Sequence, residues 1–209
     1  WKKESEEFHV VDELPFWYDG RGYVNKKRTR LSVFNELTGA LAPLTAPVMD
    51  VGAYVLSPDK KRVVFAGNDV KGWRITDQGL YSVMLPDGET ETLIPLGGQD
   101  FDKLLFWKGQ LVIAGSIGGE KMNLDSFKLY TYDEKSRGMT LLLDPDEELG
   151  ASVTCESGMG GDPMRVVGED VYLVTGCEYQ GRLSAWKPGE TALRRLSPEG
   201  LCVLSFEQA

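Results

Sequence analysis

A short segment around Ser116 has the residues nearest to those of a hydrolase nucleophile. Ala114-Gly115-Ser116-Ile117-Gly118 is a variant of the G-x-S-x-G elbow, in which small residues beside the serine let the chain turn sharply. In hydrolases with this elbow an acid and then a histidine follow the serine, but the single histidine, His9, precedes it. No helical pattern follows either. The sequence therefore predicts no catalytic residue, and we interpret Ser116 as part of a strand-end turn.

Two polar segments match binding motifs only in part. Residues 158–162 are rich in glycine but lack the Lys-Ser/Thr pair and the helix of a phosphate loop. The acidic run Asp144, Asp146, Glu147 and Glu148 lacks the ligand spacing and central glycine of a calcium loop. We predict a flexible loop and a solvated loop, respectively. With one histidine and no CxxC pair, the sequence predicts no metal site and no cofactor.

An aromatic segment near the N-terminus is the candidate for ligand contact. Its aromatic residues are Phe16, Trp17, Tyr18 and Tyr23, which flank Asp19-Gly20-Arg21-Gly22. Adjacent residues of a strand face opposite sides, so the four rings cannot all enter the core. We predict Trp17, Tyr18 and Arg21 as contacts for a peptide and its carboxylate. The alternative is a hairpin that packs its aromatic rings on neighbouring structure.

Charge and composition narrow the classes of partner. The 209 residues carry a net charge of −9, which disfavours nucleic acid; the basic stretch at residues 26–30 is interpreted as a solvated hairpin. No stretch approaches the roughly 18 apolar residues that span a bilayer, so we expect no membrane contact. Three widely spaced cysteines, Cys155, Cys177 and Cys202, argue against a disulfide framework and favour a cytoplasmic location.

The most informative feature is an internal repeat. Four segments share one pattern with leucine in second position, at intervals of about fifty residues. They are Arg30-Leu31-Ser32-Val33-Phe34, Gly79-Leu80-Tyr81-Ser82-Val83, Lys128-Leu129-Tyr130-Thr131-Tyr132 and Arg182-Leu183-Ser184-Ala185-Trp186. A turn with glycine follows each one, and we predict positive φ at these glycines. They are Gly39, Gly88, Gly138 and Gly189.

Two further strands precede the later repeat segments. Segments 62–67, 110–115 and 170–176 are apolar on both faces, as expected of strands between neighbouring sheets. Before them, opening strands are predicted at 52–56, 104–107 and 164–167. Four short strands in a unit of this length are typical of a β-propeller blade. A single β-sandwich, the structural alternative, does not explain the repeat.

The sequence thus predicts an all-β partial propeller of about four four-stranded antiparallel blades. The blades are expected at residues 1–47, 48–98, 99–145 and 146–200, with the start of another at 201–209. Propellers close with roughly four to eight blades, so we interpret the chain as an arc of a seven- or eight-bladed ring. The first residue is Trp1, and we treat the chain as a fragment. Its open blade faces are expected to favour self-association.

The first unit carries a more specific resemblance. It reads Phe16-Trp17-Tyr18-Asp19-Gly20-Arg21-Gly22-Tyr23, then a basic hairpin, Thr38-Gly39, Pro43-Leu44-Thr45 and Ser57-Pro58-Asp59-Lys60 before an apolar strand ending in Phe65. Residues 8–70 in this way resemble the propeller of the prolyl oligopeptidase family, in its acylaminoacyl-peptidase branch. Lys60 stands where that pattern usually has glycine, and the third and fourth units lack Ser-Pro-Asp.

The resemblance implies a non-catalytic role for this chain. In that family a C-terminal α/β-hydrolase domain, absent from these 209 residues, holds the Ser-Asp-His triad, and the propeller admits only short peptides. The chain is then a non-catalytic gate of a serine peptidase. Two alternatives remain open: a free-standing propeller that binds a protein or ligand, and a sugar-active propeller enzyme, which needs carboxylates converging from several blades. A WD-repeat adaptor is disfavoured because no Trp-Asp dipeptide occurs.

Overall fold

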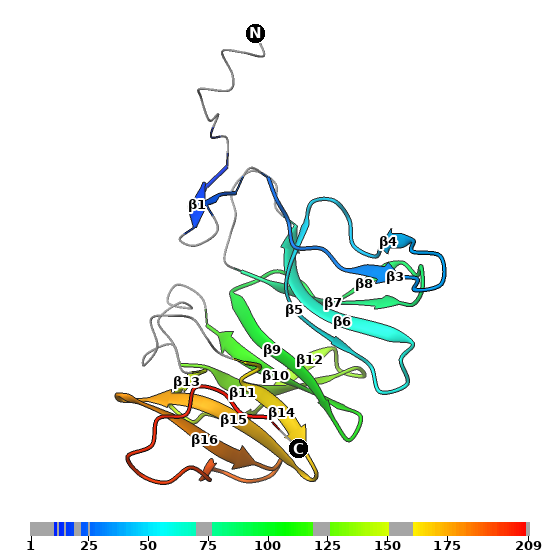
Figure 1. Cartoon of the computed structure of the whole chain (residues 1–209). Coiled ribbons are helices and arrows are strands. Elements are labelled where there is room, and N and C mark those ends of the chain that lie inside the picture. The colour runs from blue at the N-terminus through cyan, green and yellow to red at the C-terminus, as the bar shows by residue number, and fades with distance from the viewer. Residues whose placement is uncertain are drawn as a thin grey trace.

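The computed structural model describes residues 11, 13–14, 16–18, 22–24, 26–69, 77–118, 126–150 and 161–207, with only the backbone of Tyr18. Every regular element in this part of the chain is a strand, and the strands form separate antiparallel sheets stacked along an arc (Figure 1). No sheet closes into a ring among the described residues. The all-β partial propeller predicted from the repeat is confirmed.

Two sheets have four strands in sequence order. The first contains β5 (Met49–Leu56), β6 (Arg62–Asp69), β7 (Gly79–Met84) and β8 (Thr90–Ile94). The second contains β9 (Gln99–Trp107), β10 (Gln110–Ile117), β11 (Lys128–Asp133) and β12 (Gly138–Leu143). Both opening strands begin several residues earlier than predicted. The additional residues alternate between buried and more exposed, which is the pattern of a strand with one covered face.

The third sheet has its opening strand in two parts. Its strands are β13 (Glu148–Leu149), β14 (Met164–Val167), β15 (Asp170–Cys177), β16 (Gln180–Trp186) and β17 (Arg194–Arg195). β13 and β14 both pair with β15, at opposite ends of that strand. The chain between them leaves the sheet after Leu149 and returns at Pro163, whose carbonyl accepts a hydrogen bond from Val174 N–H.

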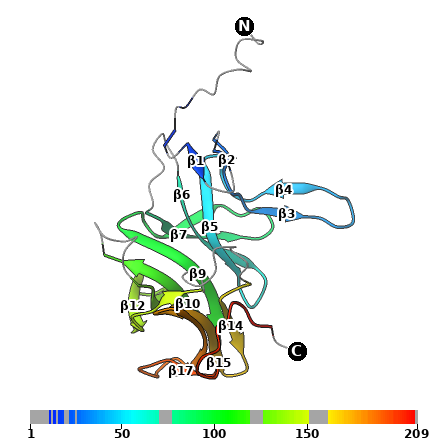
Figure 2. The ribbon, with the colours of Figure 1, turned by 60° about the vertical axis from the view of Figure 1, so that its left-hand side comes forward.

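The first repeat unit differs from the others. Its described strands form two separate pairs, β1 (Trp17–Tyr18) with β2 (Gly22–Tyr23), and β3 (Ser32–Phe34) with β4 (Leu41–Pro43). The described residues of this unit do not form one four-stranded sheet. β3 and β4 extend away from the body as a hairpin (Figure 2), whose tip exposes Phe34 and Leu37.

Apolar side chains fill the seams between neighbouring sheets. One cluster joins β5–β8 to β9–β12 through residues such as Val64, Leu80, Phe101 and Ile113. A second cluster joins β9–β12 to the third sheet, with Trp186 fully buried at its centre. Burial of this kind contributes on the order of 25 cal/mol for each Å² removed from water. Each sheet is therefore stabilised mainly by the sheets beside it.

The turns follow the prediction in part. Gly39 and Gly189 have positive φ, as expected after their strands. The same prediction is wrong for Gly88 and Gly138, neither of which has positive φ. In the turn that contains Gly138, the preceding residue Arg137 takes the left-handed conformation instead. Gly88 is constrained by space, since a Cβ there would lie 2.7 Å from the Met84 carbonyl oxygen.

A recurring hydroxyl closes the outer edge of two units. The Thr45 hydroxyl accepts a hydrogen bond from Leu31 N–H at 3.2 Å, and the Ser197 hydroxyl accepts one from Leu183 N–H at 3.2 Å. Leu31 and Leu183 are equivalent residues of the repeat. The hydroxyl residue that ends each of these two units therefore has a structural role.

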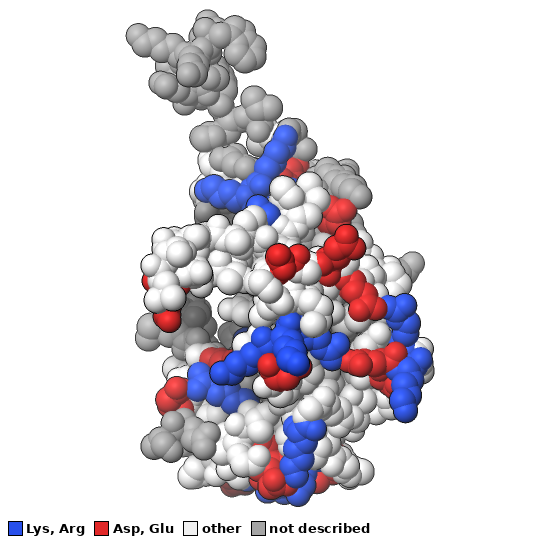
Figure 3. All heavy atoms as spheres, turned by 90° about the vertical axis from the view of Figure 1, so that its right-hand side faces the viewer, with Lys and Arg blue, Asp and Glu red and all other residues white. Residues whose placement is uncertain are grey.

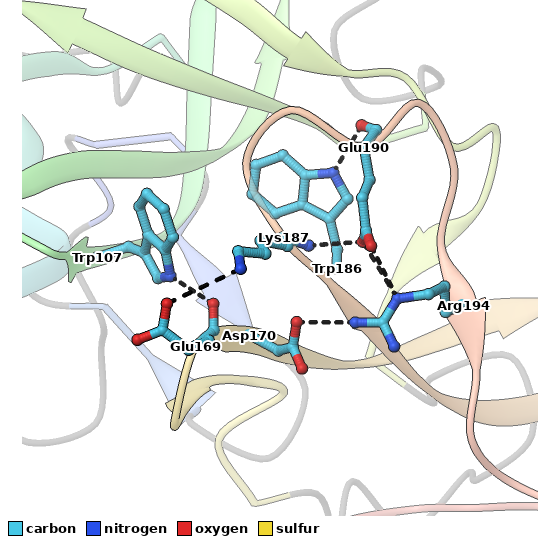
Figure 4. A network of polar contacts seen from close by, with 7 residues as sticks. All are labelled: Trp107, Glu169, Asp170, Trp186, Lys187, Glu190 and Arg194. Carbon is cyan, nitrogen blue, oxygen red and sulfur yellow. Dashed lines mark hydrogen bonds and ion pairs between the residues drawn. The ribbon is translucent and has the colours of Figure 1, made fainter.

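Polar contacts also connect the second and third sheets at one end of their seam (Figure 4). The indole N–H of Trp107 donates to the Glu169 carbonyl at 2.9 Å, and the Glu169 carboxylate pairs with Lys108 and Lys187. Close by, Arg194 bridges Asp170 and Glu190. The face in Figure 3 likewise mixes acidic and basic side chains, so it shows no large basic patch.

Candidate functional site: the aromatic hairpin and the inner strands

The aromatic segment predicted to contact a ligand forms the β1–β2 hairpin. Trp17 lies opposite Tyr23, and their rings meet edge to face with centroids 5.0 Å apart and an interplanar angle of 86°. Gly22 has φ of +71°, which lets the chain reverse next to the Trp17 ring. The Trp17 side chain is still 51% exposed. One contact within the hairpin therefore orients this ring while leaving a face available.

The hairpin is held at its base. Glu13 and Arg28 form an ion pair of 2.9 Å whose side chains are almost fully buried. Val24, also buried, donates its N–H to the Phe16 carbonyl at 2.9 Å. Of the predicted contacts, only Trp17 has a described side chain; the Tyr18 side chain and Arg21 lie outside the described residues. The ion pair and the hydrogen bond therefore anchor a hairpin on which Trp17 remains exposed.

The opening strand β9 contacts both of the other opening strands, β5 and β14. We call these three the inner strands, and the side of the arc that they form the narrow side. An acidic residue occupies the same register position near the start of each sheet. Asp50 pairs with Asn68, Asp100 with Ser116 and Glu148 with Gly176. The sequence analysis missed this alignment, although comparing the repeat units position by position would have found it.

β9 places a second acid beside the first, at a β-bulge. Lys103 pairs with Ala114 and Phe101 with Gly115, which leaves Asp102 unpaired and exposed on the inner strand. Desolvation by the surrounding protein is the main cause that raises the pKa of Asp102, to about 6, and the charges of Asp100 and Glu148 add to it. The side chain nevertheless reaches solvent. Asp100, Asp102 and Glu148 therefore lie close enough for their charges to interact.

Asp100 is held by hydrogen bonds. Gln78 Nε2 donates to Asp100 Oδ1 at 2.9 Å, and Gln78 Oε1 accepts Phe101 N–H at 3.4 Å. Burial is the main cause that raises the Asp100 pKa, with the Asp77 charge adding to it. Lys103, the nearest cation on the strand, pairs with Asp162 at 3.2 Å. The narrow side therefore presents carboxylates that attract cationic groups.

The remaining sequence candidates have mainly structural positions. Ser116 is buried inside β10, so the predicted strand-end turn is wrong: the strand continues to Ile117 because Ser116 still pairs with Asp100. The acidic run is more ordered than the predicted solvated loop, since Asp144 pairs with Lys128 at 3.0 Å and Glu147 with Arg182 at 3.8 Å. Of the glycine-rich loop, residues 158–160 lie outside the described residues.

The described residues contain no group of three side chains of the types that hold a metal ion. Within the same part of the chain, no helix has the length and apolar character needed to cross a membrane. The described site consists of the exposed aromatic hairpin and the carboxylates of the narrow side. Among the described residues, neither of these two parts pairs a nucleophile with a base.

No family model matches the chain, and no curated protein matches it either. Solved structures do match. The acylaminoacyl peptidase of Pyrococcus horikoshii aligns with 97% of this chain and 30% of its own, at 17% identity and a TM-score of 0.64. A puromycin-hydrolyzing peptidase of Mycobacterium tuberculosis aligns with 77% of this chain and 24% of its own, at 16% identity and a TM-score of 0.57.

A third match is TolB from Acinetobacter baumannii, which aligns with 85% of this chain and 40% of its own, at 16% identity and a TM-score of 0.53. The chain thus spans between a quarter and two fifths of these proteins. At such identities the likeness concerns the fold, which is the partial propeller described above.

Proposed function

We propose that this chain is the propeller segment of a serine peptidase of the prolyl oligopeptidase family, acylaminoacyl-peptidase type, and that it gates the access of short peptides to a separate hydrolase domain. The observation that carries the proposal is the alignment of nearly the whole chain with an acylaminoacyl peptidase. The aromatic-Asp-Gly-x-Gly segment of the first unit supports it independently. In this proposal the C-terminal hydrolase domain of the same parent chain is the partner.

The exposed Trp17 ring supplies a contact for peptide in this gate, together with Tyr18 and Arg21. Flat aromatic surfaces and arginine are the groups that contribute most at recognition surfaces. The acidic narrow side acts before a peptide reaches the aromatic hairpin, because carboxylates raise the local concentration of positively charged peptides. These roles concern binding and selection. The acyl transfer itself belongs to the serine triad of the hydrolase domain.

The test is an assay of the intact parent protein on acylated short peptides and on an unfolded protein substrate. We expect hydrolysis of the short peptides alone. Trp17→Ala should raise KM several-fold with little change in kcat, because it removes a binding contact and leaves the triad intact. Phe34→Ala, which removes another exposed aromatic side chain, on the β3–β4 hairpin, is the matched control. Cleavage of the unfolded protein at a comparable rate would refute the gate.

The second candidate is a free-standing propeller that binds a protein or a ligand; we keep it because the solved structures that match include TolB as well as peptidases. A parent protein without any peptidase activity would support this candidate. We further propose a cytoplasmic location, supported by Cys177, which forms no disulfide among the described residues. Self-association through open blade faces is also proposed. A mass measurement in solution across protein concentrations tests it, and a monomer at all concentrations would refute it.

A further inference from the structure

Three polar side chains lie on one face of the third sheet, at one end of its seam with the second sheet. Thr175 on β15 lies opposite Arg182 on β16, and directly opposed residues point to the same face. Glu147 precedes β13, whose Leu149 pairs with Thr175, so strand alternation places Glu147 on this face as well. Arg182 Nη1 lies 3.8 Å from Glu147 Oε1. The apolar seam residues Leu173 and Trp186 share the face.

One polar atom of each side chain is buried without a hydrogen-bond partner. These atoms are Thr175 Oγ1, Glu147 Oε2 and Arg182 Nε. Thr175 itself is 0% exposed. A buried polar group without a partner is strongly unfavourable, and native proteins seldom retain three of them together. The set comprises a donor, an acceptor and a hydroxyl that can act as either.

The other two sheets show that this cluster depends on the shape of the third. The position of Thr175 is Gly67 in the first sheet and Gly115 in the second. A Cβ at either glycine would come within 2.5 Å of a backbone carbonyl oxygen, because bulges in β5 and β9 bring that carbonyl close. In the third sheet the opening strand is divided into β13 and β14, and the division lies at the position that the bulge has in the other two sheets. Position 175 is therefore free to carry a side chain.

We propose that Glu147, Thr175 and Arg182 form a binding site for one internal water molecule, which joins the segment before β13 to strands β15 and β16. Internal waters typically make about three hydrogen bonds to buried polar groups that otherwise have no partner. The charges disfavour a small ion, because Arg182 repels a cation and Glu147 repels an anion. A neutral molecule that both donates and accepts satisfies all three atoms.

The first test replaces Thr175 with valine, which has the same shape and no hydroxyl. If water occupies the site, Thr175→Val removes one of its partners and lowers Tm by roughly 2–4 °C. If the seam is dry, the substitution removes an unsatisfied hydroxyl, and Tm stays the same or rises. The sign of the change in Tm therefore decides the question, and an unchanged or higher Tm overturns the proposal.

Two matched variants accompany it. In Thr131→Val the lost hydroxyl is one that donates to the Leu111 carbonyl at 2.9 Å and accepts from Gln110 Nε2 at 3.0 Å, so Tm should fall. Thr175→Ser keeps the hydroxyl and should lower Tm less than Thr175→Val. If Thr175→Ser, which keeps the hydroxyl, lowered Tm as much as Thr175→Val, the loss would not depend on the hydroxyl, and this result would count against the water.

A second measurement does not depend on any variant remaining folded. Magnetisation transfer from water to the Thr175 methyl group is measured by NMR on the full 209-residue chain. A bound water gives a cross-peak with the sign of a long-lived contact, whereas a dry seam gives none. If Thr175→Val fails to fold, the presence or absence of this cross-peak in the unsubstituted chain decides the proposal.

Discussion

Gly115 and Asp100 approach each other more closely than any side chain would allow. A Cβ built on Gly115 would lie 2.2 Å from the Asp100 carbonyl oxygen and 2.9 Å from the Phe101 Cα. Both clashing atoms belong to the backbone of the bulged inner strand, so neither can rotate away. The bulge that presents Asp102 on the narrow side is therefore compatible only with glycine at position 115.

The first prediction follows from this contact. Gly115→Ala should lower the free energy of unfolding by more than about 2 kcal/mol, because the inner strand must shift to admit the methyl group. Urea denaturation followed by tryptophan fluorescence measures the change. Gly138→Ala is the control: its nearest neighbour is a Ser136 hydroxyl at 3.5 Å, and its φ is not positive. Equal effects of the two substitutions would contradict the explanation.

Lys60 stands in a conformation that glycine adopts more easily. Its φ is +58°, in the turn where Ser57 Oγ donates to Asp59 Oδ1 at 2.7 Å. A non-glycine residue in the left-handed region costs about 1–2 kcal/mol, which the greater freedom of glycine in the unfolded chain offsets in part. We predict that Lys60→Gly raises the urea midpoint slightly. Lys61→Gly, at a neighbouring residue without positive φ, should leave the midpoint unchanged or lower it.

Asp102 makes stability depend on pH in an unusual direction for a carboxyl group. Its pKa is raised to about 6 in the folded protein, so the folded state binds a proton more readily than the unfolded state does. This contribution is fully present below the ordinary pKa of the carboxyl group and is lost as pH rises through about 6. We predict that Asp102→Asn stabilises the chain at pH 7.5 relative to the unsubstituted protein and gives little gain near pH 4.

The control for Asp102 has the opposite sign. The N–H groups of Lys135 and Ser136 lower the pKa of Asp133, so its carboxylate favours folding at neutral pH and loses this effect as pH falls. Asp133→Asn should therefore reduce stability at pH 7.5 more than at low pH. Urea midpoints of both variants across this pH range provide the comparison. Parallel pH profiles would refute the assignment for Asp102.

The buried hydroxyl of Ser197 should be needed for the outer edge of the third sheet. Ser197→Ala leaves Leu183 N–H without its acceptor, and we predict a loss of about 1–2 kcal/mol in the free energy of unfolding. Ser32→Ala, in an exposed part of β3, should change it by less than about 0.5 kcal/mol. Hydrogen exchange at Leu183 gives a local readout, because its N–H should exchange faster only in the Ser197 variant.

Most strands could be predicted from the sequence because their signals are local. The segments beginning with Gly79 and Lys128 and the apolar strands before them alternate or end at turn residues as strands do. The segment predicted at 182–186 likewise lies within a strand, β16. The first unit was harder, since nothing local indicates that, among the described residues, β1 and β2 pair only with each other.

The candidate site was predicted less completely. Trp17 was identified from its aromatic neighbours, but its exposure depends on the contact with Tyr23 and on the hairpin base. Asp102 and Thr175 gave no signal as single residues. The properties of Asp102 come from the bulge in β9, and those of Thr175 come from the division of the opening strand of the third sheet into β13 and β14. Both features depend on how neighbouring strands pair.

The sequence by itself determined the class of fold, because strand alternation, turn residues and a repeat of about fifty residues are written in consecutive positions. It also determined that this chain lacks a serine-acid-histidine order. Only the tertiary structure decided which carboxylates line the narrow side, why Gly67 and Gly115 cannot be replaced, and where polar atoms meet in a seam. The physical reason is that burial, pKa shifts and close backbone approach arise from residues far apart in the chain that packing brings together.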